Sequence, residues 1–182
     1  MALMTILIVI LTGIVLLFIL AYNKLVSLRN QTENAWSQID VQLKRRYDLI
    51  PNLVESVKGY MKHEKETLTK LTELRSKLIS GNINEKAKAN NQFSDALKSI
   101  FAVAENYPKL KANTNFLNLQ EELSATENKI SYSRQFYNDA VYGLNTAIDS
   151  FPTNIISGMF NFSKKEYFGV NENERKPVKV SF

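Results

Sequence analysis

The chain has 182 residues, a formal net charge of +5 and no cysteine. The lack of cysteine excludes a disulfide framework and thiolate metal sites, and a domain of this size does not need either of them. Once an apolar N-terminal run is set aside, about 160 residues remain, which is enough for one soluble domain with its own core. Lys and Glu are interspersed through residues 55–77, and the one dense basic cluster is Lys44-Arg45-Arg46.

The N-terminal run, residues 1–23, contains no charged side chain and is dominated by aliphatic residues. About 20 such residues in a helix cover the ~30 Å hydrocarbon layer of a bilayer. Tyr22 and Lys24 stand where the run ends, as interfacial aromatic rings and snorkelling cations do. The run therefore predicts a transmembrane helix. Its small residues Thr5, Thr12 and Gly13 would allow a second helix to approach closely.

A cleaved signal peptide is the alternative interpretation of this run. A signal peptide has a basic N-terminal region and a small residue three positions before the cleavage site, whereas here no charged side chain precedes the run and Ile19 occupies that position. Cations instead follow the run, at Lys24, Arg29 and residues 44–46. The positive-inside rule then predicts a single-pass protein whose C-terminal domain lies in the cytoplasm.

A long helix is expected to continue from the run. From Leu25 to Leu78, apolar residues recur at spacings of three and four, which is a helical pattern. Pro51 lies inside this stripe, and the stripe keeps its phase across it, so the prediction is one rod from about residue 5 to residue 78 with a bend at Pro51. Gly81 is expected to end the rod in a left-handed cap.

Three further helices follow in the predicted order. The second is expected from Asn84, a good N-cap, to about Asn106. The third begins at residues 113–115, runs for more than thirty residues and ends at Phe151-Pro152. A short fourth helix begins at Pro152 and ends near Gly158, and an irregular tail follows.

Together these elements predict an all-α protein. One N-terminal transmembrane helix continues into an antiparallel bundle of long helices, with a short C-terminal helix and an irregular tail. The expected division is 1–23 for the transmembrane helix, 24–160 for the bundle, and 161–182 for a tail that packs on the bundle or extends from it.

Several stretches of the sequence carry a family resemblance. They are YNKLV at 22–26, ENAWSQIDVQLKRRYDLIPNLV at 33–54, YPKLKAN at 107–113, TENKI at 126–130 and Phe151-Pro152. In this order they closely resemble the LemA family of bacterial membrane proteins, from Tyr22 to about Phe168. The resemblance implies a short N-terminal segment, one membrane helix and a helical-bundle domain in the bacterial cytoplasmic (inner) membrane. It implies no reaction, because no catalytic motif is established for the family.

Two charged residues, Glu127 and Arg134, fall on or beside the apolar stripe of the third helix. A charge that faces a bundle core needs a partner on another helix. Such pairs would form either an active site or, as we favour, a polar layer that fixes helix register. The candidate partners are Arg45 or Arg46 for Glu127, and Glu33, Asp48 or Glu105 for Arg134.

Other polar and aromatic residues are candidates for an interface. Trp36 is expected to anchor the core or a subunit contact, and buried or facing amides would specify partner and register. The amides are Asn34, Gln38, Gln42, Asn52, Asn128 and Asn138. His63 is the only histidine and lacks a second ligand on its helix face, so no metal and no cofactor are expected. No aromatic-basic platform for nucleic acid is present in the sequence.

The sequence therefore favours a non-enzymatic, membrane-anchored helical scaffold that forms homo-oligomers or binds a protein partner at the membrane face. The first alternative is an oligomeric assembly that shapes or stabilises the membrane. The second is an enzyme that uses the region of Glu127 and Arg134. An open pocket containing both residues and unpaired polar groups would favour the enzyme over a filled polar layer.

Overall fold

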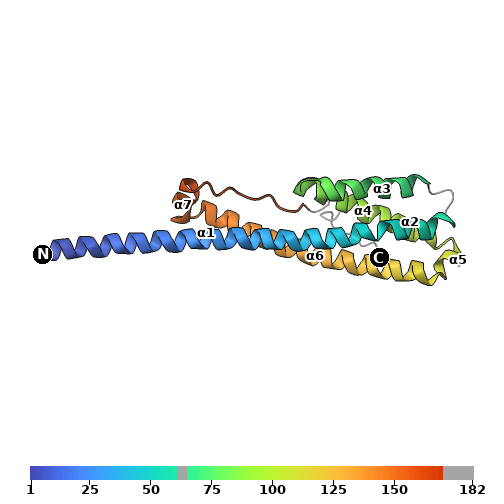
Figure 1. Ribbon diagram of the computed structural model, residues 1–182, viewed down its shortest axis with the longest axis horizontal. Helices are drawn as coiled ribbons and strands as arrows, with labels where there is room; N and C mark the ends of the chain where they lie inside the picture. Colours follow the sequence, from blue (N-terminus) through green and yellow to red (C-terminus); the bar gives the residue numbers. More distant parts are fainter. Residues whose placement is uncertain (61–64, 170–182) are drawn as a thin grey trace, which may run out of the picture. The chain divides into compact units, whose positions relative to one another are not determined.

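The computed structural model describes residues 1–60 and 65–169, and every element in these ranges is an α-helix (Figure 1). The all-α prediction is confirmed. The helices are α1 (Ala2–Asp48), α2 (Ile50–Lys58), α3 (Lys65–Ser80), α4 (Ile83–Ala104), α5 (Pro108–Lys111), α6 (Thr114–Asp149) and α7 (Thr153–Met159).

The helices form two compact units. The first unit contains residues 1–37 and 135–167, and the second contains the described residues of 38–134 together with residues 168 and 169. Helices α1 and α6 each contribute residues to both units. The expected division at residues 23 and 160 stays a prediction.

Helix α1 is continuous for 47 residues, with no linker between Ala21 and Gln31. It is long and apolar enough at its N-terminal end to cross a membrane. The break near Pro51 is short: Leu49 alone separates α1 from α2, and it keeps a helical backbone with φ −79° and ψ −18°. Pro51 lies in the first turn of α2, where its missing N–H removes no helical hydrogen bond. The interruption thus lies within one turn of Pro51, as expected.

The rod does not reach residue 78, and this part of the prediction is wrong. Helix α2 ends at Lys58 and the chain turns at Gly59 and Tyr60, with a Tyr60 N–H···O=C Val57 bond of 3.0 Å. Helix α3 is a separate helix that packs against α2 and α4. An apolar stripe keeps the same spacing whether a helix continues or folds back, so its phase did not reveal the turn. His63 lies outside the described residues.

The start of α4 also differs from the prediction. Its N-cap is Asn82 and not Asn84, because Asn82 forms a capping box with Glu85. The Asn82 side chain accepts from the Glu85 N–H at 2.9 Å, and the Glu85 carboxylate accepts from the Asn82 N–H at 2.9 Å. Gly81 has no positive φ. Glycine fits there for a different reason: an added Cβ would lie 2.7 Å from the Lys77 carbonyl oxygen and 2.9 Å from Glu85 Cβ.

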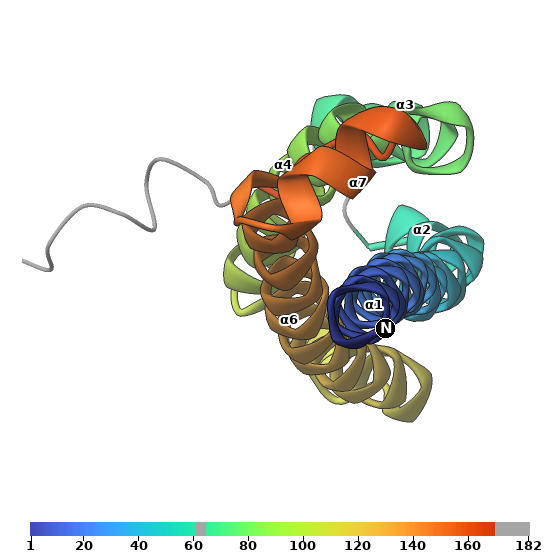
Figure 2. The same ribbon diagram turned by 90° about the vertical axis from the view of Figure 1, so that its left-hand side faces the viewer.

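Helix α6 is 36 residues long, and the Asn113 side chain caps it by accepting from the Phe116 N–H at 3.1 Å. Pro152 was expected to be the first residue of α7, but it is the N-cap, and the helix runs from Thr153 to Met159. Figure 2 shows α7 at the C-terminal end of α6. The chain after α7 lies along α6, because the Asn145 amide bonds both the N–H and the C=O of Lys165 at 2.9 Å.

Each unit has its own core. In the first unit, Ala21, Leu25, Ala147 and Ile156 are buried together, with Phe18, Tyr22, Leu28, Ile148 and Phe162 packed against them. In the second unit, the apolar stripes of α1 to α4 and of the first part of α6 are buried. The largest fully buried apolar side chains of these helices are Ile39, Leu43, Ile50, Leu53, Leu71, Leu78 and Phe93.

Gly81→Ala should destabilise the second unit by about 1–3 kcal/mol, because the new methyl group would meet a backbone oxygen that cannot move freely. Gly59→Ala is the matched control: Gly59 has a right-handed helical backbone and open space around it, so this change should be neutral or slightly stabilising. Urea unfolding of the full chain in detergent, followed by circular dichroism, measures both. Equal stability of the two variants would contradict the assigned contact.

Candidate functional site

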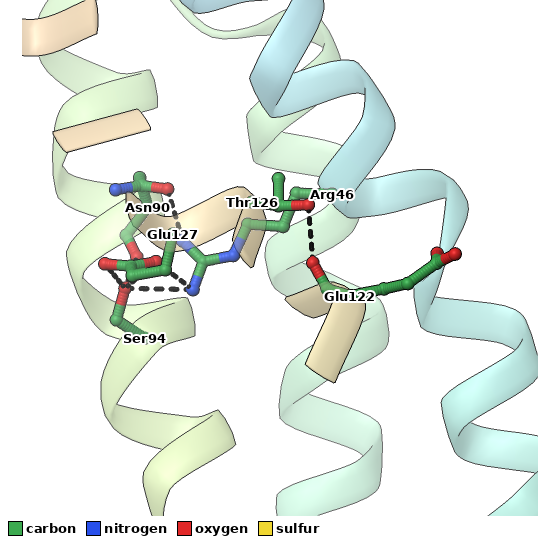
Figure 3. Close-up of polar contacts among 6 residues, drawn as sticks. All are labelled: Arg46, Asn90, Ser94, Glu122, Thr126 and Glu127. Carbon is green, nitrogen blue, oxygen red and sulfur yellow. Dashed lines mark hydrogen bonds and ion pairs between the residues drawn. The ribbon is translucent and has the colours of Figure 1, made fainter. Parts of the chain in front are cut away.

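Arg46, on the last turn of α1, is a charged residue of the second unit that is only 1% exposed. Its guanidinium reaches α4 and α6 (Figure 3). Arg46 Nη2 lies 2.5 Å from Glu127 Oε2, and Nη1 donates to Asn90 Oδ1 at 2.6 Å. The guanidinium also lies over the Phe93 ring, 4.6 Å from its centroid. Arg46 therefore joins three helices through one charged group.

Ser94 completes this polar layer. Its hydroxyl accepts from Arg46 Nη2 at 3.1 Å and lies 3.0 Å from Glu127 Oε1, to which it can donate. Asn90 and Ser94 are four residues apart, so they project from the same face of α4. Glu127 is thus bound by an ion pair and by a hydroxyl, while its own side chain stays 43% exposed.

The electrostatics of the layer follow from its burial. Burial lowers the pKa of Arg46 from its ordinary value to about 10, and the Glu127 carboxylate opposes this effect. Arg46 therefore remains a cation at neutral pH. Within the part of the chain that the structure describes, no acceptor reaches Arg46 Nε. The guanidinium is held by its two terminal nitrogens and by the Phe93 ring alone.

A hollow of about 230 Å³ lies beside this layer. Arg46, Ser94 and Glu127 form its polar end, and Leu97, Phe101 and Leu123 form its apolar end. Lys98, Gln120 and Ser124 complete the lining. Arg134 does not belong to this lining, and it is half-buried two turns farther along α6. The structure thus places Glu127 in an ion pair with Arg46, and Arg134 is not among the residues that line this hollow.

The remaining predicted residues divide by exposure. The basic cluster is split, because Lys44 and Arg45 are exposed whereas Arg46 is buried. Trp36 is half-buried and packs edge-on against Tyr137, with ring centroids 5.5 Å apart. Asn138 is also half-buried. The exposed members of the predicted set are Thr5, Thr12, Gly13, Lys24, Glu33, Asn34, Gln38, Asp48 and Glu105.

Sequence reasoning missed several polar residues that the structure brings into contact. Asn90 and Ser94 were not singled out, although their spacing of four on the apolar face of a helix was a readable signal. Thr32 is buried on the inward face of α1, and its hydroxyl bonds the Leu28 carbonyl at 2.9 Å and lies 3.3 Å from the Ala140 carbonyl. Tyr137 donates to the Glu166 carbonyl at 2.9 Å, and burial followed by the Glu166 charge raises the pKa of its phenol.

A second hollow, of about 540 Å³, opens between α2 and α6 in the second unit. Its lining is rich in amides and carboxylates, which makes it polar and acidic. The lining residues are Leu49, Asn52, Glu55, Ser56, Asn115, Asn118, Leu119 and Glu122.

Comparison with known proteins assigns the family. The model of the LemA family matches residues 35–182, which takes in the Arg46 layer and both hollows. The chain belongs to the LemA family. The expected resemblance is confirmed, and this LemA-family match begins after the apolar part of α1.

Three relatives are similar over most of this LemA-family chain. Protein LemA of Metamycoplasma hominis is 30% identical over 161 residues, which cover 87% of this chain and 74% of that protein. Magnetosome protein MamQ 2 of Paramagnetospirillum magneticum is 26% identical over 92% of this chain and 71% of its own length. Magnetosome protein MamQ of Magnetospirillum gryphiswaldense is 20% identical over 82% of this chain and 65% of its own length.

Glu127→Gln should destabilise this LemA-family chain by about 1–3 kcal/mol, because the buried Arg46 charge would lose its carboxylate. The loss should stay below that of a fully buried pair, since Glu127 is partly exposed. The double variant Arg46→Met/Glu127→Gln should recover part of the loss, because it removes the buried charge as well. Urea unfolding followed by circular dichroism measures the free energy of unfolding of the wild-type chain and of each variant.

Glu122→Gln is the matched control for this cycle. Glu122 lies on the same helix, is exposed, and points away from Arg46 (Figure 3), so its substitution should change stability little. If Glu127→Gln and Glu122→Gln had the same free energy of unfolding, the ion pair between Arg46 and Glu127 would not stabilise the fold.

Proposed function

We propose that this chain is a non-enzymatic, membrane-anchored helical scaffold that self-associates or binds a partner protein at the cytoplasmic face of the bacterial inner membrane. The observation that carries this proposal is the surface of α1. Its large aliphatic side chains from Leu3 to Leu20 are exposed by between 49% and 82%. An apolar surface of this extent is stable in a bilayer and not in water.

The continuity of α1 supports the anchoring role. The helix that carries the apolar surface also carries Leu25 in the first unit and Ile39 and Leu43 in the second, all of them buried. No flexible residue separates the anchor from these cores. The anchor therefore fixes the direction in which the folded chain leaves the membrane.

The polar layer supports a structural role over a catalytic one. Glu127, the candidate acid or base, is already engaged by Arg46 and Ser94. A catalytic carboxylate would need to face a substrate pocket with a free proton-accepting oxygen. A layer that ties α1, α4 and α6 together instead fixes the register of those helices.

Self-association is favoured by the exposed small residues of the anchor. The Thr5 and Thr12 hydroxyls bond carbonyls of their own helix, at 2.7 Å to Ala2 and 2.8 Å to Ile8, so they present compact surfaces. A Cβ added at Gly13 meets nothing within 4 Å in the same chain. Packing of anchors through such residues would hold the exposed amides Asn34 and Gln38 of neighbouring chains at high local concentration. The alternative function, an oligomeric assembly that shapes or stabilises the membrane, would need the same contact between neighbouring anchors.

Gly13→Leu in the full-length chain should shift the protein in mild detergent from oligomer towards monomer, because the added side chain would separate the anchors and disturb nothing within one chain. Leu7→Phe is the matched control: it adds bulk at an exposed position on the opposite face of α1 and should leave the oligomer unchanged. Light scattering reports the mass of each protein. A monomeric wild-type chain would contradict self-association.

A further inference from the structure

Helix α7 buries two hydroxyl side chains and exposes two of its large apolar side chains, while the Asn154 amide is also exposed. Thr153 and Ser157 are buried, and their hydroxyls bond the carbonyls of Ala147 and Ile148 near the end of α6. Ile155 is 55% exposed and Met159 64% exposed. Only Ile156 turns an apolar side chain towards the core. In water this arrangement is the reverse of the usual one.

The residues that flank α7 continue this pattern. Phe151 is 81% exposed and Phe160 is 48% exposed. Residues 150–163 contain no charged side chain. Charges resume on both sides of this stretch, at Asp149 and Lys164, whose side chains pair at 2.7 Å. An uncharged stretch with exposed aromatic and aliphatic side chains is typical of a segment that lies in a membrane interface.

The same stretch packs directly against the apolar part of α1. The Phe160 ring lies 6.0 Å from the Phe18 ring and 4.8 Å from the Tyr22 ring. Next to these rings is a hollow of about 260 Å³ with an apolar lining. The hollow is lined by Ile14, Leu17, Phe18, Pro152, Ile155 and Ile156. Helix α7 and residues 14–18 of α1 therefore lie at the same level.

The length of α1 fixes the depth of that level. The apolar run continues to Ala21, and the first charged side chain after it is Lys24. A helix that crosses the ~30 Å hydrocarbon layer with this run therefore places residues 14–21 in the layer. If the hydrocarbon layer ends at Ala21, Phe18 and Ile14 lie about 5–10 Å inside it, which is the depth at which interfacial helices bury their apolar face.

Cations stand just outside this depth. Lys24 follows the apolar run, and the Arg29 guanidinium lies 5.4 Å from the centroid of the Phe162 ring, to which it is drawn by a cation–π contact. Lys164 and Lys165 follow the uncharged stretch. Positive groups at this level match the anionic headgroups of the leaflet.

We propose that α7 and its flanking residues, 151–160, are inserted into the leaflet from which α1 emerges, and that lipid acyl chains cover Ile155 and Met159 and fill the apolar hollow. The inference rests on the proposed membrane anchor. The chain thus holds the bilayer at two places: α1 crosses it, and α7 occupies one leaflet beside α1.

Depth-dependent quenching tests this insertion in the full-length chain. The chain has no cysteine, so single cysteines can be introduced and labelled with the fluorophore NBD. The test positions are Ile155→Cys and Met159→Cys. Val9→Cys, within the apolar run and 70% exposed, reports the anchor, and Tyr142→Cys, 65% exposed on α6, is the water-exposed control. A Cβ added at Gly143, next to Tyr142, would lie 3.7 Å from Leu28 Cδ2, and Leu28 is seven residues beyond Ala21. Position 142 is therefore expected outside the hydrocarbon layer.

Each variant is reconstituted into phosphatidylcholine–phosphatidylglycerol vesicles with or without brominated acyl chains. We expect NBD at positions 155 and 159 to emit at shorter wavelength than at position 142. We also expect bromolipid to quench it to an extent comparable with position 9, while position 142 is unaffected. Circular dichroism confirms that each labelled chain is folded.

Quenching at position 9 without quenching at 155 and 159 would overturn the insertion of α7 and leave the anchor in place. Positions 155 and 159 shielded from both bromolipid and aqueous iodide would equally overturn it, because a protein surface, such as a second copy, would then cover α7. No quenching at position 9 would refute the membrane anchor itself, and with it the proposed function.

Discussion

The exposed apolar surface of α1 is the constraint on which the rest of the structure depends. A helix satisfies all of its backbone hydrogen bonds internally, so it can place bare aliphatic side chains in lipid at no polar cost. The same helix then changes character after Ala21: one face becomes buried, beginning with Leu25 and continuing through Ala35 and Ile39. The apolar segment and buried residues of both units therefore belong to one helix, α1.

The second unit depends on a charge that is costly to bury. Arg46 is almost fully buried, and its pKa is lowered to about 10, which shows the penalty of removing the guanidinium from water. Glu127, Asn90 and Ser94 offset that penalty only when α1, α4 and α6 are in one particular register. Apolar stripes tolerate sliding by a turn, whereas this layer does not. We therefore propose that this layer contributes to the specificity of helix packing more than to net stability.

The features that depend on local periodicity could be predicted from the sequence. These include the continuity of α1 through Tyr22, the interruption next to Pro51 and the all-helical class. The turn after Lys58 could not be predicted, because the apolar stripe has the same spacing in a continuous rod and in two packed helices.

The candidate site was only partly visible in the sequence. Glu127 stood out because a charge interrupts a stripe, but its arginine was one of two neighbours, and only the folded chain shows that Arg46 faces inward while Arg45 faces water. The N-cap Asn82 could have been predicted, since of the two asparagines Asn82 and Asn84 only Asn82 has a glutamate three residues later. The inverted polarity of α7 was hidden, because Thr153 and Ser157 resemble ordinary capping residues until their carbonyl partners are known.

The most direct measurement of the central claim, that α1 crosses the inner membrane and delivers the folded units to the cytoplasm, is labelling of a single cysteine at Tyr132, which is 74% exposed. We expect a membrane-impermeant maleimide to label Tyr132→Cys only after cell lysis. Labelling in intact cells whose outer membrane has been made permeable would contradict it.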